Sequence, residues 1–178
     1  MSDGFTTVYD SSDGLPVRLE AARRHTADGA VYTHHRLVVS DGRTGAVIVA
    51  RDGDRLLLVL SARDAVGADL WEFPRGAGEA EETAVETALR ELQEETGLRG
   101  VDPCLLGDYV TDSSIFPQRV AVVECRIDAD APRTIPDGEV SDRRWITVED
   151  LADAVRDGTV RDAHTLAAIT VLSSRKEL

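Results

Sequence analysis

Glutamates are concentrated in one short segment of the chain, residues 76–98. On a helix that advances about 100° per residue, Glu91, Glu94 and Glu95 fall within an arc of about 100°. Three carboxylates this close repel one another unless they point into water or share divalent cations. Mg²⁺, with Mn²⁺ as a substitute, prefers oxygen ligands and keeps open positions for phosphate oxygens and a water. Two interpretations follow: a metal site, or a solvated helix face with an Arg90–Glu94 ion pair.

The spacing of the whole segment favours the metal site. It reads glycine, five residues, glutamate, seven residues, and then Arg-Glu-apolar-x-Glu-Glu-x-Gly-apolar. This pattern satisfies every fixed position of the Nudix box, so the chain resembles the Nudix hydrolases. The resemblance implies an α+β fold, an α/β/α sandwich with a mixed sheet and a loop-helix-loop catalytic motif. It also implies hydrolysis of a nucleoside diphosphate linked to another moiety.

The resemblance assigns roles within the box. Glu91, Glu94 and Glu95 become metal ligands, with the backbone carbonyl of Arg75 as a fourth, and Glu94 and Glu95 are also counted as catalytic. The remaining fixed positions are structural. They are Gly76 and Gly97, which let the loops turn, Arg90, which orients a glutamate, and its partner Glu82.

Segments outside the box resemble the ADP-ribose pyrophosphatases within that family. Arg63, in the stretch VLSARDAVGADLWEFPRGAGE, takes the place of a phosphate-binding arginine, although the two residues before it depart from the usual Gln and Tyr. Phe116 is a candidate to stack on a nucleobase, in a loop that lacks the usual Pro-Gly. Glu139, in a later loop, is the candidate general base, with Asp137 as its substitute.

Other residues of chemical interest carry weaker signals. Trp71, in the apolar stretch LWEF, is expected in the core. Cys104 and Cys125 lack a CxxC partner and are expected to be small core residues. His164, on a predicted amphipathic helix, is expected at a surface or an interface. The histidines on predicted outer strands are assigned no catalytic role; they are His25, His34 and His35.

Composition limits the partners. With 178 residues, 42% of them apolar, the chain can bury one good core. A formal net charge of −13, and no run of Lys or Arg longer than two residues, argue against polymeric nucleic acid. The N-terminus lacks the pattern of a secretory signal and no apolar stretch is long enough for a membrane span, so we expect a cytoplasmic protein with no membrane partner.

The elements that must position the glutamates follow from periodicity and turn residues. A helix is predicted from Thr83 to Thr96, ended by Gly97. Apolar strands at 45–51 and 55–60 form a predicted central hairpin. The other predicted elements are strands at 70–73, 105–110, 119–127 and 143–147, and helices at 147–157 and 162–173.

The beginning of the chain reads as a separate unit. Residues 17–39 predict a hairpin whose tight turn lies at 27–30. We therefore expect residues 1–43 to form an N-terminal β-hairpin extension and residues 44–178 to form the Nudix hydrolase domain. In ADP-ribose pyrophosphatases such an extension pairs two chains, so the resemblance implies a homodimer.

The expected substrate is a small nucleoside diphosphate derivative, with ADP-ribose or another nucleotide sugar first, cleaved to two phosphomonoesters. The alternatives are a nucleoside triphosphate, a dinucleotide or an isoprenoid diphosphate. A module that binds a nucleotide sugar without cleaving it is a further alternative. The intact set of box carboxylates argues against that last interpretation.

Overall fold

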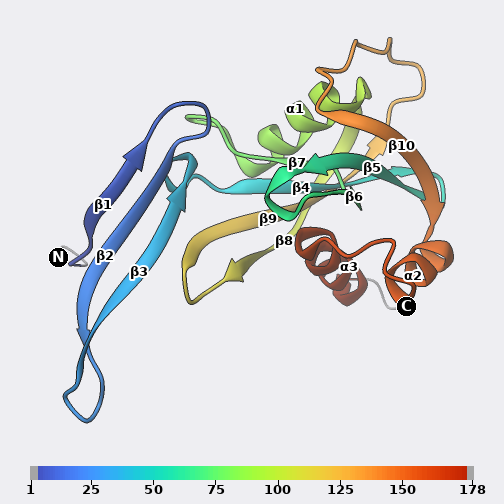
Figure 1. Cartoon of the computed structure of the whole chain (residues 1–178). Helices are drawn as coiled ribbons and strands as arrows, with labels where there is room; N and C mark the ends of the chain where they lie inside the picture. Colours follow the sequence, from blue (N-terminus) through green and yellow to red (C-terminus); the bar gives the residue numbers. More distant parts are fainter. Residues whose placement is uncertain (1–3, 176–178) are drawn as a thin grey trace.

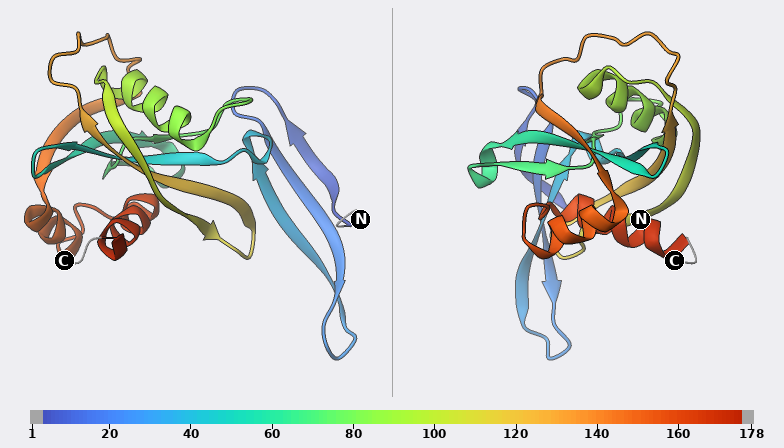
Figure 2. Two further views of the ribbon diagram at one scale, coloured as in Figure 1. Left: turned by 180° about the vertical axis from the view of Figure 1, so that it is seen from behind. Right: turned by 90° about the vertical axis from the view of Figure 1, so that its right-hand side faces the viewer.

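The computed structural model describes residues 4–175. They form a three-stranded antiparallel sheet and a larger mixed sheet that has helices on both faces (Figure 1). The smaller sheet projects from the body of the molecule in both views of Figure 2. The α+β class and the α/β/α sandwich expected from the sequence are confirmed.

The smaller sheet contains β1 (Thr6–Ser11), β2 (Val17–His25) and β3 (Val31–Val39), in that order. The predicted hairpin is confirmed as β2–β3, and a 2.9 Å hydrogen bond from Thr26 N to Ala30 O closes its turn. The sequence reasoning missed β1. Its residues are almost all exposed on the sheet edge, so they carry none of the apolar alternation that reveals a half-buried strand.

The larger sheet is built around β4 (Gly45–Asp52). Its strands run in the order β10-β5-β4-β9-β8, and β4 is parallel to β9, whereas its other pairings are antiparallel. The remaining bounds are β5 (Arg55–Arg63), β6 (Ala68–Glu72), β7 (Arg75–Gly76), β8 (Gly100–Asp112), β9 (Phe116–Ile127) and β10 (Val140–Thr147). Since β4 and β5 are flanked on both sides, the predicted central hairpin is confirmed.

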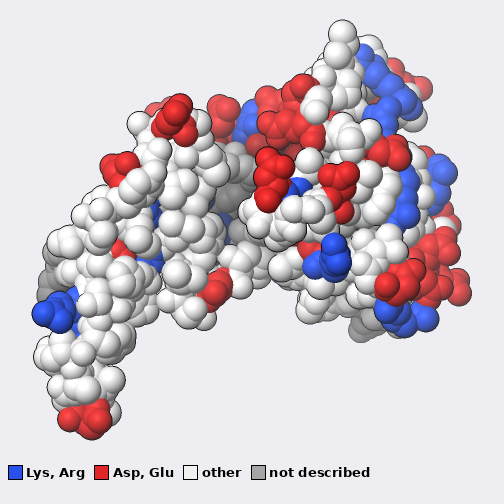
Figure 3. All heavy atoms as spheres, in the orientation of Figure 1, with Lys and Arg blue, Asp and Glu red and all other residues white. Residues whose placement is uncertain are grey.

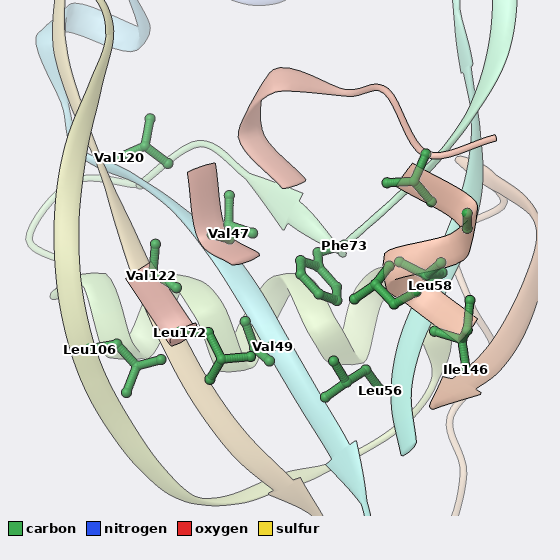
Figure 4. Close-up of a cluster of buried hydrophobic side chains, with 14 residues drawn as sticks. Val47, Val49, Leu56, Leu58, Phe73, Leu106, Val120, Val122, Ile146 and Leu172 are labelled. Carbon is green, nitrogen blue, oxygen red and sulfur yellow. The ribbon is translucent and has the colours of Figure 1, made fainter. Parts of the chain in front are cut away.

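Two hydrophobic clusters separate the sheet from its helices. Helix α1 (Ala84–Thr96) covers one face, and α2 (Val148–Arg156) and α3 (Ala163–Arg175) cover the other (Figure 1). Successive residues of β4 alternate between the two clusters, with Val47 and Val49 on the α2 and α3 side, as Figure 4 shows. The continuous apolar run in the sequence therefore reflects burial on both faces.

Helix α1 begins and ends at the residues that the sequence indicated. Thr83 and Glu86 form a reciprocal capping box, with 2.8 Å from Thr83 N to the Glu86 carboxylate. Gly97 ends the helix with a left-handed φ of 68°, and its N–H bonds the carbonyl of Gln93. These local signals fix the length of the helix that carries the carboxylates.

The two cysteines differ in burial. Cys125 is buried beneath α1, as expected, but the prediction for Cys104 was wrong, because its side chain is exposed. The pairing of β8 with β9 shifts register between Val101 and Cys104, and such a bulge reverses which face a side chain occupies. Among the helices in residues 4–175, none has the length and apolar character needed to cross a bilayer.

The smaller sheet is attached to the body by backbone and side-chain hydrogen bonds. The Gln118 side chain accepts from Val39 N at 2.8 Å and donates to Val39 O at 2.5 Å, so it pairs with β3 as a neighbouring strand would. The amide of Leu37 donates to the carbonyl of Ile115 at 2.8 Å. These contacts hold the end of β3 next to the turn between β8 and β9.

Candidate active site

Arg90 lies at the centre of the carboxylates of α1 and the loop before it. Its guanidinium donates 2.8 Å hydrogen bonds to Glu82, Glu91 and Glu94, and a 3.0 Å bond to the carbonyl of Ala77. The bond from Arg90 lowers the pKa of Glu82 to about 2. The structure thus places Arg90 and Glu82 where an orienting pair would be needed, between the box loop and the helix.

Glu95 is buried on the inner side of the same helix. Its Oε2 has no hydrogen-bond partner. Burial, together with the neighbouring carboxylates of Glu91 and Glu72, raises the pKa of Glu95 to about 8. Burial also raises the pKa of Glu91. A buried carboxyl group with an unpaired oxygen, next to a partly buried one, is an environment in which a bound cation would stabilise the ionised forms.

The short strand β7 runs beside these glutamates. The backbone of Arg75 hydrogen-bonds Glu95, and a Cβ added at Gly76 would lie 2.0 Å from the carboxyl carbon of Glu91. Only glycine permits this approach. Gly97 is similarly restricted, because a Cβ there would lie 2.2 Å from the carbonyl oxygen of Thr134. The structure therefore brings the backbone of β7 close to the carboxyl groups of Glu91 and Glu95.

The donors at this place are oxygens, which fits Mg²⁺ or Mn²⁺. In residues 4–175, no three carboxylate, imidazole or thiol side chains converge on a common point. Glu91 and Glu94 instead point to Arg90. The expected ligands are thus neighbours, but the carboxylates of Glu91 and Glu94 are hydrogen-bonded to Arg90.

A cleft of about 470 Å³ opens between α1, the larger sheet and the smaller sheet. Figure 3 shows acidic side chains gathered over α1 on the upper part of the body. The cleft brings together most of the candidate residues, which are Arg63, Arg75, Gly76, Arg90, Glu91, Glu94, Phe116, Asp137 and Glu139. Glu95 does not line this cleft; it lines a smaller hollow with Pro136 and Arg143. Glu82 and Gly97 do not line the cleft.

The sequence reasoning missed Glu72, which organises the arginines of the cleft. This carboxylate is fully buried, and it accepts hydrogen bonds from Arg63 and, at 3.4 Å, from Arg75. Arg75 also lies 3.8 Å from Asp162. Arg63 is therefore a partly buried, oriented residue of the cleft wall. A glutamate inside the apolar stretch LWEF was the available signal, because a charged residue on a buried strand needs a partner.

The loop that carries the candidate base is attached to α1. Asp137 N donates to Glu94 O at 2.9 Å, and Thr134 N donates to Gly97 O at 3.1 Å. The side chain of Asp137 in turn accepts from Glu139 N at 2.9 Å. Glu139 is close enough to Glu91 for its charge to raise the pKa of Glu91, behind the larger effect of burial. Glu139 therefore lines the same cleft as Glu91 and Glu94.

His164 is not the surface or interface residue that we expected. It is partly buried, lines the cleft, and lies 2.7 Å from the hydroxyl of Tyr109 through Nδ1. The sequence signal was a lone histidine within the apolar pattern of α3. Trp71, by contrast, packs against the core, with the guanidinium of Arg144 over its ring at 4.3 Å. His25, His34 and His35 all lie on the smaller sheet, away from this cleft.

Comparisons with known proteins agree with the fold and the box. ADP compounds hydrolase, a solved structure, superposes with a TM-score of 0.77 over 96% of this chain and 93% of that chain, at 18% identity. The putative mutator protein MutT4 of Mycobacterium tuberculosis is 34% identical over 149 residues, 79% of this chain and 60% of that protein. The ADP-ribose pyrophosphatase of Bacillus subtilis is 28% identical over 80% of this chain and 78% of its own.

A further relative matches around the box. The RNA pyrophosphohydrolase of Halorhodospira halophila is 48% identical over 73 residues, 40% of this chain, and the match spans 38% of that protein. The family model described as NUDIX domain matches residues 41–169, well over half of the chain. With the box geometry described above, this match shows that the chain belongs to the Nudix hydrolase family.

Proposed function

We propose that the chain is a Mg²⁺-dependent pyrophosphohydrolase that cleaves ADP-ribose or another nucleotide sugar to two phosphomonoesters. The observation that carries the proposal is that one cleft is lined by side chains of both charges. Its lining includes the carboxylates Glu91, Glu94 and Glu139 and the arginines Arg63 and Arg75. Such a lining suits a diphosphate bound together with cations, because carboxylates hold the cations and arginines hold the phosphate oxygens.

The proposed cation ligands are Glu91, Glu94, Glu95 and the carbonyl of Arg75. A bound Mg²⁺ would neutralise phosphate charge and make a coordinated water more acidic. Glu139 accepts the proton of the attacking water, while a new P–O bond forms and the bridging P–O bond breaks. Arg63 donates hydrogen bonds to phosphate oxygens as charge develops on them. With ADP-ribose, the products are AMP and ribose 5-phosphate.

The smaller sheet and the turn beside it supply the part of the cleft that is remote from the carboxylates. Leu15, Val39 and Phe116 line it there with Arg43. An apolar lining next to charged groups is typical of small-molecule sites, and the volume of about 470 Å³ lies within their usual range. We propose that this end contacts the nucleobase or sugar, with Phe116 as the stacking residue.

Residues 1–43 are proposed to pair two chains, while residues 44–178 hold the catalytic groups. The support is a set of large apolar side chains exposed on the smaller sheet, including Val8, Tyr9, Val31 and Tyr32. Exposed apolar side chains on a projecting sheet are suited to contact with another protein surface. Sedimentation that gives only monomer would remove this part of the proposal.

A substrate panel tests the proposed function. Purified protein with Mg²⁺ or Mn²⁺ would be offered ADP-ribose, other nucleotide sugars, dinucleotides, nucleoside triphosphates, isoprenoid diphosphates and 5′-triphosphorylated RNA, and the products would be identified by ³¹P NMR. We expect two phosphomonoesters from a nucleotide sugar. Release of pyrophosphate from a triphosphate would favour the alternative substrate class, and no turnover on the whole panel would reject the enzyme. Glu149→Gln, at an exposed position of α2, serves as the control for variants of the box.

A further inference from the structure

Tyr109 on β8 and His164 on α3 form a side-chain pair next to the cleft. The Tyr109 hydroxyl lies 2.7 Å from His164 Nδ1, and the ring centroids are 5.9 Å apart. Both rings are partly buried. His164 lines the cleft together with Arg63 and Arg75. No role in the proposed mechanism has been given to either ring.

The position of His164 is fixed by the start of α3. Thr165, the next residue, is fully buried, and its hydroxyl accepts from Phe73 N at 3.0 Å and donates to Asp162 at 2.9 Å. Asp162 also accepts from Thr165 N at 2.8 Å. These bonds attach the first turn of α3 to the chain just before β7. The imidazole is therefore held on a rigid part of the fold.

The hydrogen bond to Tyr109 bears on which nitrogen of the imidazole carries the proton. Burial raises the pKa of Tyr109, so its hydroxyl keeps its proton and can donate to Nδ1. Burial, together with the charges of Arg75 and Arg63 and against that of Asp162, lowers the pKa of His164 to about 4. A neutral imidazole that accepts at Nδ1 carries its proton at Nε2.

The arginines beside His164 are already paired. Glu72 accepts from both Arg63 and Arg75, and Asp162 lies 3.8 Å from Arg75. This side of the cleft thus offers hydrogen-bond donors whose charge is largely balanced by buried carboxylates. A neutral N–H donor among them suits an anionic oxygen, because hydrogen bonds to charged groups are stronger than neutral ones.

We infer that His164 contacts the substrate: its Nε2–H donates a hydrogen bond to a phosphate oxygen of the diphosphate, beside Arg63. Tyr109 is then the positioning residue, which holds the imidazole in the tautomer protonated at Nε2. The inference rests on the proposed function for the identity of the substrate. The contact forms in the ground state, so its loss acts on binding more than on the chemical step.

Two replacements of His164 separate substrate contact from packing. The amide nitrogen of Gln can take the place of Nε2, whereas Asn reaches only as far as Nδ1 and keeps a partner for Tyr109. We expect His164→Asn and His164→Ala to raise KM about tenfold with kcat within about threefold, and His164→Gln to stay within about threefold of wild type for both. His25→Ala, on an exposed position of β2, is the control.

Binding and spectroscopy test the inference without turnover. Calorimetric titration with inorganic pyrophosphate and Mg²⁺ should rank the affinities of the variants in the same order as their KM values. The Kd of His164→Asn should be about tenfold larger than that of wild type. The ¹⁵N spectrum of the imidazole should show Nε2 protonated and Nδ1 not, and Tyr109→Phe should mix the tautomers. The His164→Gln spectrum identifies the resonances.

The variants, the titration and the spectrum each have an outcome that contradicts a role of His164 in substrate binding. His164→Asn equal to wild type, His164→Gln as weak as His164→Ala, or protonation at Nδ1 would each overturn the inference, as would wild-type protein that binds no pyrophosphate. If no panel substrate is cleaved but the pyrophosphate series follows the expected order, the proposed function fails while the role of His164 stands.

Discussion

The backbone amide of Asp137 donates a 2.9 Å hydrogen bond to the carbonyl of Glu94. This bond attaches the loop of the proposed base to the helix of the proposed metal ligands. Because Thr134 is bonded in the same way to Gly97, that loop satisfies two of the carbonyls at the C-terminal end of α1. The helix and the loop should therefore keep their relative positions when substrate enters the cleft.

Glu95→Gln should separate metal binding from folding. Gln keeps the shape and removes a carboxyl group whose ionisation burial disfavours, so the metal-free variant is expected to be at least as stable as wild type. Turnover should fall at least about 100-fold. Mg²⁺ should raise the Tm of wild type by mass action and leave that of the variant unchanged, as measured by differential scanning fluorimetry. An equal Mg²⁺ response in both proteins would exclude Glu95 as a ligand.

Gly76→Ala tests the close approach of β7 to α1. The added methyl would lie 2.0 Å from the Glu91 carboxyl carbon, so that side chain must move. Because the end of a flexible side chain can shift, we expect a cost of about 1 kcal/mol in unfolding free energy, the low end for overpacking, with loss of most of the activity. Urea unfolding and initial rates measure both. In Gly107→Ala, the methyl meets only Val171 at 3.4 Å, and near-normal behaviour is expected. Wild-type activity in Gly76→Ala would contradict the packing described here.

Glu72→Gln should affect stability and binding together. It removes the buried negative charge and one of the two acceptor oxygens that Arg63 and Arg75 share. We expect a loss of about 3 kcal/mol, at the low end for a buried pair because both arginines can still reach water. KM should rise because Arg63 is no longer oriented. Urea unfolding and substrate titration measure these effects, with Glu149→Gln as the control. A stability change without a KM change would show that Glu72 has no part in substrate binding.

The pH dependence of stability should reveal His164. Its pKa is about 4 in the folded chain, below the ordinary value of 6.5, because burial disfavours the charged ring. The unfolded chain therefore binds the proton first, and the free energy of unfolding falls as the pH is lowered from about 6.5 towards 4. His164→Gln should lose this component and show a shallower fall in urea unfolding over that range. Parallel curves for the two proteins would contradict the buried neutral imidazole.

The sequence predicted the parts of the site that are local in the chain. Arg90 and Glu94 are one helical turn apart, and the cap residue Thr83 and the stop at Gly97 fix the helix that holds them. The fixed spacing of the box residues lies within one short segment, so the box could be recognised without the fold. The apolar strands β4 and β5 could also be predicted, because their continuous apolar residues indicate burial.

The parts that could not be predicted depend on long-range packing. His164 joins Arg63 and Arg75 in lining the cleft only because α3 packs against the sheet, and no local pattern encodes that arrangement. The pairing of Glu72 with those two arginines likewise depends on the tertiary fold. Cys104 was misplaced because a bulge, which has no clear sequence signal here, reversed its face. The exposed edge strand β1 offered no periodicity to detect.

The projecting sheet of β1, β2 and β3 also determines how the molecule moves through solution. Figures 1 and 2 show an arm standing off a rounded body, so even a single chain is elongated. An elongated particle has a larger frictional coefficient than a sphere of equal mass, and it elutes early from a sizing column. The Stokes radius alone will therefore overstate the mass of one chain, and light scattering is the measurement that counts the chains in an assembly.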